Sequence, residues 1–225
     1  MRIAVGTSKG VIEIIDICDY LDGLKNQNEK KNKMRPKKVH DIAISAMRMN
    51  RRGDVLVTGD NNGCVKVFQS KLDTELMHLE KNNEDDPERH NDAVRDIAFS
   101  PTYEKYVTCS ADKTLRISDL KNGLVEKVLE GHGSDASTVD WHPYYSLLAS
   151  GGKDRYIKIW DPRQKGEICS MYNHTNSISK VRFSESGDYL LSGAKDQMVK
   201  LFEIRAMKEL KCFRMHDSEV LCKSK

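Results

Sequence analysis

The stretch at residues 131–161, GHGSDASTVDWHPYYSLLASGGKDRYIKIWD, contains His132, Ser150 and Asp154 within one short span. These are the residue types of a nucleophilic triad, in which a base activates a serine and a carboxylate orients the base. The same side chains can also hydrogen-bond one another in a purely structural role. How often the pattern recurs along the chain decides between the two interpretations.

The pattern recurs with a period of 42 residues. His90, His132, His174 and His216 are equally spaced at that interval, and His40 lies 50 residues before His90. Four of these histidines, His40, His90, His132 and His174, are each followed eighteen residues later by a residue with a hydroxyl group. These residues are Thr58, Thr108, Ser150 and Ser192. Twenty-two residues after the same four histidines stand Asn62, Asp112, Asp154 and Asp196, and twenty-eight after them Phe68, Ser118, Trp160 and Phe202. An active site needs its triad once, whereas a structural device is needed once per repeat, so the repetition predicts structural histidines.

Short apolar segments lie between these anchors. The segment after each histidine is about six residues long and reads ISAMRM, VRDIAF, ASTVDW or ISKVRF. A turn rich in Pro, Gly and Ser follows, then two further apolar segments separated by a tight polar turn, then a weaker fourth segment. Four short antiparallel strands per repeat, with no helical periodicity, predict an all-β fold built from β-propeller blades.

The pairs Gly131-His132 and Trp160-Asp161 resemble the WD-repeat family. In that family the histidine enters the blade, the Asp lies in the turn between the second and third strands, and a Ser or Thr and a Trp complete a hydrogen-bonded tetrad. The resemblance implies one full tetrad here, formed by His132, Ser150, Asp154 and Trp160. It implies partial tetrads in the other repeats, where no indole is present: His40, Thr58, Asn62 and Phe68; His90, Thr108 and Asp112; His174, Ser192, Asp196 and Phe202.

The repeats divide the chain into four whole blades and two partial ones. We expect whole blades at about 40–89, 90–131, 132–173 and 174–215, and partial blades at 1–39 and 216–225. A ring of seven blades, usual for the family, would need on the order of 290 residues at this period, more than the 225 present. Either the sequence is part of a seven-bladed protein, or residues 216–225 pair with 1–39 to close a small ring.

Composition limits the class of protein. The chain has 37 basic and 34 acidic residues and a net charge of +3, which is well short of a dedicated nucleic-acid clamp. Its six cysteines form no C-x-x-C pair and no metal-ligand spacing, so we expect free thiols in a reducing compartment. Neither a signal peptide nor a membrane-spanning apolar run is present, so we expect an intracellular protein with no membrane partner. We also expect no metal, cofactor or small-molecule substrate.

Three stretches carry a more specific resemblance. Gly-His-Gly at 131–133, Val-Asp-Trp-His-Pro at 139–143, and Lys-Leu-Phe-Glu-Ile-Arg at 200–205 followed by Lys-Glu-Leu at 208–210 resemble the WD-repeat subunits of the eukaryotic cleavage and polyadenylation factor. The resemblance implies a nuclear, non-enzymatic subunit that docks onto a large propeller scaffold. With a zinc-finger subunit, such proteins help to recognise the AAUAAA signal of pre-mRNA. Because much of that RNA contact comes from a basic arm ahead of the first blade, we expect contact with pre-mRNA only within the assembled complex.

Two groups of residues are candidates for a partner or RNA surface. The first is the basic part of the segment KNQNEKKNKMRPKKVH at 25–40, with Lys30, Lys31, Lys33, Arg35, Lys37 and Lys38. It could neutralise phosphates or direct nuclear import, or it could be a solvated loop. The second group lies at the ends of blades, on the rim where propellers bind partners, and comprises Arg95, Lys153, Ser179 and Lys195; surface lysines can equally be merely solvated.

Three functional hypotheses follow. The first is a scaffold subunit of the mRNA 3′-end processing complex, which predicts co-purification with polyadenylation factors. The second is a peptide-reading adaptor in another assembly, such as a ubiquitin ligase or a ribosome-assembly complex, with rim arginines around a central pocket. The third is a hydrolase built on His132 and Ser150, which the repetition of the pattern disfavours.

Overall fold

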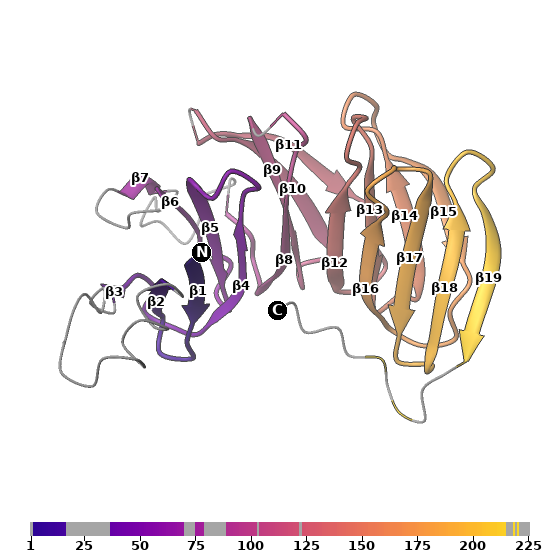
Figure 1. Ribbon diagram of the computed structural model, residues 1–225, viewed down its shortest axis with the longest axis horizontal. Helices are drawn as coiled ribbons and strands as arrows, with labels where there is room; N and C mark the ends of the chain where they lie inside the picture. Colours follow the sequence, from indigo (N-terminus) through magenta and orange to yellow (C-terminus); the bar gives the residue numbers. More distant parts are fainter. Residues whose placement is uncertain are drawn as a thin grey trace.

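The computed structural model describes residues 2–16, 37–69, 75–78, 89–102, 104–121, 123–214, 218 and 220. All regular structure in these residues is β-strand, arranged as five antiparallel sheets. The sheets follow one another along the chain and stand side by side in a curved row (Figure 1). This is the expected all-β arrangement of propeller blades, and closure of the row into a ring is not seen in the described residues.

Four sheets contain four strands each, and every strand pairs with the next one along the chain. The 44–78 sheet consists of β4 (Ile44–Met49), β5 (Val55–Asp60), β6 (Val65–Gln69) and β7 (Glu75–His78). The 94–130 sheet consists of β8 (Val94–Phe99), β9 (Lys105–Ser110), β10 (Thr114–Asp119) and β11 (Val125–Glu130). The 136–172 sheet consists of β12 (Ala136–Trp141), β13 (Leu148–Gly152), β14 (Tyr156–Trp160) and β15 (Glu167–Tyr172). The 178–214 sheet consists of β16 (Ile178–Phe183), β17 (Tyr189–Ala194), β18 (Met198–Glu203) and β19 (Lys208–Arg214).

The two ends of the chain are described only in part. A three-stranded sheet contains β1 (Arg2–Gly6), β2 (Val11–Asp16) and β3 (Lys37–Lys38). Of the expected partial unit at 216–225, only residues 218 and 220 are described. Lys30, Lys31, Lys33 and Arg35 lie outside the described residues, and of Lys37 only the backbone is described.

The first strands of neighbouring sheets, β4, β8, β12 and β16, lie next to one another on the inner side of the row (Figure 1). Polar side chains join them. Asp96 on β8 accepts hydrogen bonds from the Thr138 hydroxyl on β12 (2.9 Å) and from Lys180 Nζ on β16 (2.6 Å). Arg182 on β16 donates to Asp140 on β12 (2.8 Å). Because the Asp96–Lys180 pair is half-buried, its Coulomb attraction is screened less than at a fully exposed surface.

A large apolar side chain fills the core at the same place in three sheets. Trp160, Phe68 and Phe202 each stand opposite a leucine on the neighbouring strand: Leu148, Leu56 and Leu190, respectively. In the 94–130 sheet the pair is exchanged, because the small Ser118 stands opposite the large Tyr106. All these side chains are buried. Each of the four four-stranded sheets therefore has one aromatic ring in this layer of its core.

Neighbouring sheets also lock together through a glycine on the second strand. A Cβ added at Gly59 would meet the Val94 side chain at 2.6 Å, and one at Gly151 would meet Ile178 at 2.6 Å. Gly193 faces Val220 in the same way. In the 94–130 sheet, Cys109 takes the glycine position, and the residue that begins the next sheet is the smaller Ala136. A larger residue on the second strand is therefore matched by a smaller residue at the start of the next sheet.

Candidate functional site

The four side chains of the full tetrad lie in hydrogen-bond contact. His132 Nδ1 lies 2.7 Å from Asp154 Oδ2, and His132 Nε2 lies 2.7 Å from the Ser150 hydroxyl. The Trp160 indole N–H donates to the same hydroxyl at 2.8 Å. Because an ionised carboxylate only accepts, Nδ1 carries the proton and Nε2 accepts from Ser150. The serine hydroxyl thus donates to the imidazole and accepts from the indole.

Two other sheets repeat this geometry without the indole. His90 lies 2.8 Å from both Asp112 Oδ2 and the Thr108 hydroxyl. His174 lies 2.8 Å from Asp196 and 2.6 Å from the Ser192 hydroxyl. Phe202 is fully buried in the place of Trp160. Each of the two carboxylates also accepts the backbone N–H of the residue after its histidine, so it ties the entry loop to the turn before the third strand.

Burial determines the charge state of these pairs. It lowers the pKa of His90 and His174, although the neighbouring carboxylates act in the opposite direction. Burial would raise the pKa of Asp112, Asp154 and Asp196, but hydrogen bonds from the histidines and from backbone N–H groups outweigh it and hold each pKa below its usual value. His90 and His174 are therefore neutral donors to ionised carboxylates.

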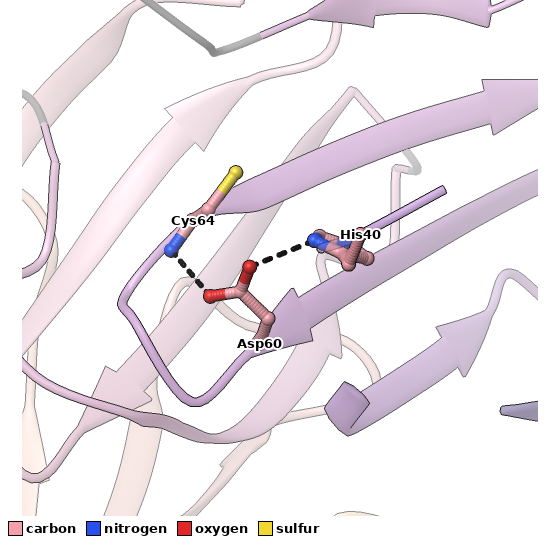
Figure 2. Close-up of side chains that lie close together, drawn as sticks. All are labelled: His40, Asp60 and Cys64. Atoms are coloured by element: carbon pink, nitrogen blue, oxygen red, sulfur yellow. Dashed lines mark hydrogen bonds and ion pairs between the residues drawn. The ribbon is translucent and has the colours of Figure 1, made fainter. Parts of the chain in front are cut away.

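The expectation for Asn62 is wrong. His40 binds the Thr58 hydroxyl at 2.8 Å as expected for the repeat, but its Nδ1 lies 2.9 Å from Asp60 Oδ2 and not against Asn62 (Figure 2). Asp60 stands two residues earlier, at the end of β5, in the position that Gly152 has in the 136–172 sheet. Its second oxygen accepts the N–H groups of Asn62 and Cys64. In this sheet, a carboxylate at the end of the second strand thus makes the contact with the histidine that the Asp of the turn makes in the other sheets.

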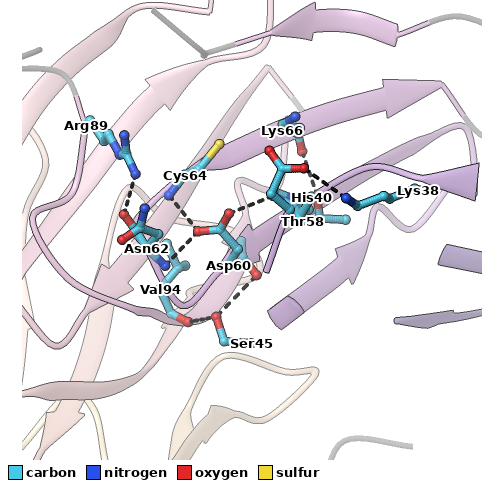
Figure 3. A network of polar contacts seen from close by, with 12 residues as sticks. Lys38, His40, Ser45, Thr58, Asp60, Asn62, Cys64, Lys66, Arg89 and Val94 are labelled. Carbon is cyan, nitrogen blue, oxygen red and sulfur yellow. Dashed lines mark hydrogen bonds and ion pairs between the residues drawn. The ribbon is translucent and has the colours of Figure 1, made fainter. Parts of the chain in front are cut away.

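Asn62 instead takes part through its backbone. Its carbonyl oxygen accepts a hydrogen bond from Arg89 Nη2 at 2.8 Å, just ahead of the next histidine (Figure 3). Nearby, the Ser45 hydroxyl donates to the Val94 carbonyl at 2.6 Å, which joins the 44–78 sheet to the 94–130 sheet (Figure 3). The polar network around His40 is therefore a connection between two sheets.

His40, Asp60 and Cys64 are the residue types that bind metal ions, and their ligand atoms lie within 4.8 Å of one another (Figure 2). Both ring nitrogens of His40 already have hydrogen-bond partners, as they do in the other three tetrads. The donor set therefore matches the structural role of the repeat, and a metal ion would have to displace the Asp60 contact.

The candidate rim residues are placed as follows. Lys153 Nζ contacts Asp135 at 2.5 Å, and Arg95 lies 3.9 Å from the same carboxylate, so the two cations share one partner. Lys195 is exposed, and so is Lys38, which binds Asp41 at 3.0 Å. The Ser179 hydroxyl is buried and has no hydrogen-bond partner among the described residues. Ser179 therefore does not contribute a hydroxyl to the surface, which corrects the expectation for this residue.

The Ser150–His132–Asp154 contacts have the connectivity of a catalytic triad, but the hydroxyl is engaged. Ser150 is fully buried, and its oxygen accepts the Trp160 N–H while its proton lies toward His132. A nucleophile must reach its substrate, and this oxygen has no open side. The arrangement can anchor a turn to a strand and satisfy a buried indole.

Within the described residues, no helical segment has the length and apolar character needed to cross a membrane.

Residues 86–119, 123–161 and 166–203 match the family described as WD domain, G-beta repeat. Polyadenylation factor subunit 2 of Gibberella zeae is 38% identical over 124 residues, which are 55% of this chain and 19% of that protein. The protein of the same name from Neurospora crassa is 36% identical over 124 residues, or 55% of this chain and 17% of that protein.

WD repeat and SOCS box-containing protein 1 of Homo sapiens is 34% identical over 109 residues, which are 48% of this chain and 24% of that protein. The chain thus spans less than a quarter of the length of each of these relatives. Proteins of the WD-repeat type are typically non-catalytic scaffolds that bind other proteins. With three matched repeats, a recurring histidine–hydroxyl–carboxylate contact and blade-like sheets, the chain belongs to the WD-repeat family.

Proposed function

We propose that the protein is a non-enzymatic scaffold subunit of the nuclear pre-mRNA 3′-end cleavage and polyadenylation complex. The observation that carries this proposal is the 38% identity to Polyadenylation factor subunit 2 of Gibberella zeae over 124 residues. Its partners would be a large propeller scaffold and a zinc-finger subunit of that complex. Pre-mRNA would be bound within the complex, with no cofactor, membrane or small-molecule substrate involved.

The geometry is consistent with a scaffold role. All four histidines of the described tetrads are engaged by a hydroxyl on one side and a carboxylate on the other, so these groups hold blades in shape. The exposed side chains at the blade ends, including Arg95, Lys153 and Lys195, can contact a partner. Such contacts at a rim mainly affect association rate and its dependence on salt.

The test is affinity purification of the tagged protein from nuclear extract, followed by mass spectrometry. We expect polyadenylation factors among the recovered proteins, and we expect the Lys153→Glu, Lys195→Glu double variant to recover less of them. Lys121→Glu is the matched control, because Lys121 is also exposed and lies outside the candidate rim set. Recovery of no polyadenylation factor would refute the proposal.

An alternative function is a peptide-reading adaptor in another assembly, such as a ubiquitin ligase. The 34% identity to WD repeat and SOCS box-containing protein 1 of Homo sapiens over 109 residues favours it. The same purification separates the two functions, because ubiquitin-ligase subunits would then replace polyadenylation factors among the recovered proteins.

A further inference from the structure

A cavity of about 270 Å³ lies where the first strands of the four four-stranded sheets end. Each sheet contributes the end of its first strand and the following turn: residues 48–51, 99–101, 140–143 and 183–185. These are equivalent positions of the repeat, counted from the histidine that precedes each sheet. The cavity therefore lies on the inner side of the row, at the end opposite to the one where the histidines enter the sheets.

The walls of the cavity combine apolar side chains with polar and charged ones. One equivalent position supplies Met49, Phe99, Trp141 and Phe183, and the next turn residues include Pro101 and Pro143. His142 adds a further ring, which lies 5.1 Å from that of Phe183. Burial lowers the pKa of His142, and its Nε2 pairs with the Gly187 carbonyl at 3.0 Å, so this ring is neutral. Such walls suit the side chains of an extended peptide.

One cation at the cavity makes no direct ion pair. Lys180, Arg182 and Arg51 each contact a carboxylate, those of Asp96 (2.6 Å), Asp140 (2.8 Å) and Glu185 (3.9 Å), respectively. Arg48 makes no hydrogen bond or ion pair with any residue in the part of the chain that the structure describes. It is half-buried, and burial and the charge of Arg182 lower its pKa, while the charges of Asp140 and Asp96, which it does not contact, act in the opposite direction. The walls carry Arg48, Arg51, Asp140 and Glu185, and because Arg182 already pairs with Asp140, the cations of this group exceed its carboxylates by one.

We propose that this cavity binds a single carboxylate of an acidic side chain in an extended peptide, with Arg48 as the residue that recognises it. The planar guanidinium matches a carboxylate through two parallel hydrogen bonds. A neighbouring apolar side chain of the peptide packs against Trp141 and Phe183. The inference rests on the proposed protein-binding function and specifies the chemistry of one partner.

A nucleic acid fits this cavity less well than an acidic peptide does. One excess positive charge matches one carboxylate, whereas a phosphate backbone presents a charge at every nucleotide. Asp140 and Glu185 line the same cavity and would repel further phosphates. The charge balance therefore selects a peptide with an isolated acidic residue.

The first experiment is selection of phage-displayed random dodecapeptides on the immobilised 225-residue chain, with Arg48→Glu as the parallel target. We expect the wild-type selection to enrich Asp or Glu next to an apolar residue, and the Arg48→Glu selection to lose that enrichment. Equal enrichment of acidic residues on both targets, or none on the wild type, would overturn the proposal.

The second experiment measures the affinity of the most enriched peptide by fluorescence anisotropy. Arg48→Ala is expected to weaken binding about tenfold or more, and replacing the peptide's acidic residue by its amide should cause the same loss. The two changes together should cost little more than either alone, because they remove the same contact. Arg205→Ala is the matched control, since Arg205 is exposed and lies outside both the cavity lining and the candidate rim residues.

Two further arms keep the result interpretable. A thermal melt must show that Arg48→Ala is folded, and binding of a Lys-substituted peptide to Arg48→Glu would restore the contact with reversed charge. Displacement of the acidic peptide by an unstructured RNA oligonucleotide would mean a nucleic-acid site and would overturn the proposal. If the peptide binds through Arg48 but no polyadenylation factor co-purifies, only the assignment to that complex fails.

Discussion

The hydroxyl groups of Ser150 and Ser192 occupy equivalent positions but have different numbers of partners. Ser150 donates to His132 and accepts from the Trp160 N–H, whereas Ser192 contacts His174 and faces a phenylalanine in place of the indole. Both serines are buried. Removing a buried hydroxyl leaves each of its partners without a hydrogen bond, so the number of partners should determine the loss of stability.

Ser150→Ala is expected to lower the free energy of unfolding by about 2–3 kcal/mol, because it leaves a buried indole N–H and a buried imidazole nitrogen unpaired. Ser192→Ala is the matched control and should cost only about 1–2 kcal/mol, because it leaves one group unpaired. Urea denaturation of both variants measures the difference. Equal losses would contradict the role of the Trp160 contact.

The tetrads also predict how stability depends on pH. Burial lowers the pKa of His90 and His174, so in acid the unfolded chain takes up protons that the native state does not. The free energy of unfolding should therefore fall as the pH falls through about 6.5, the pKa of an unperturbed histidine. It should fall again below about pH 4, because the lowered pKa of Asp112, Asp154 and Asp196 stabilises the native state only while these carboxyls are ionised in the unfolded chain.

Urea midpoints measured between about pH 8 and pH 5 test the first of these two steps. The His174→Gln variant should show a smaller decrease over that range than the wild type, because it lacks one of the histidines whose pKa burial lowers. A midpoint that rises on acidification would show that these histidines are protonated in the native state.

The residue pattern could be predicted from spacing because the tetrad contacts lie within one repeat. His132, Ser150, Asp154 and Trp160 meet because the strands between them have constant length. Spacing misled only for Asn62, since Asp60 reaches the same histidine from two residues earlier. Aligning the repeats by residue spacing cannot reveal such a substitution, because a carboxylate on the strand and one in the turn can both contact Nδ1 of the histidine.

At the scale of strands, the glycine on the second strand determines how closely the next sheet approaches. Gly59 and Gly151 lie against the large side chains of Val94 and Ile178, respectively. Where Cys109 replaces the glycine, the next sheet begins with the smaller Ala136. The first strand of one sheet therefore fits into the second strand of the sheet before it. Because both partners are buried, a change on one side should be relieved by an opposite change on the other.

Gly59→Ala should destabilise the protein by about 1–3 kcal/mol, because its Cβ would lie 2.6 Å from the Val94 side chain. Val94→Ala alone should cost about 2 kcal/mol through the cavity that it leaves. The Gly59→Ala, Val94→Ala double variant recreates the Cys109–Ala136 type of pairing and should be more stable than the sum of the two losses implies. Chemical denaturation of all four proteins gives the coupling energy, and additive losses would contradict the size exchange.

The contacts between first strands could not be predicted from the sequence. Asp96 and Lys180 are 84 residues apart, yet Lys180 Nζ lies 2.6 Å from the carboxylate. Within one repeat each residue reads as an ordinary polar position of a strand. Their pairing follows from the curvature of the row, which brings β8 and β16 together across β12, and the cavity beside Arg48 arises in the same way.

At the scale of the whole molecule, the last sheet differs from the others in what covers it. Val57, Val107 and Ala149 occupy one equivalent position on the second strands and are fully buried by the sheet that follows. Leu191 occupies that position in the 178–214 sheet and is 44% exposed. Tyr189, on the same face of β17, is also exposed. An apolar sheet face of this kind promotes self-association.

Lysine at the two equivalent positions should therefore destabilise the protein to very different extents. Leu191→Lys should lower the free energy of unfolding by about 1 kcal/mol or less, because a half-exposed site leaves the ammonium group in water. Val107→Lys should cost several kcal/mol, because it places a charge in a fully buried site. Urea denaturation measures both. Sedimentation velocity should show less self-association for Leu191→Lys than for the wild type, since the charge interrupts the apolar face. If Leu191→Lys were as damaging as Val107→Lys, the face would be covered in solution, and the open row of sheets would not describe the protein there.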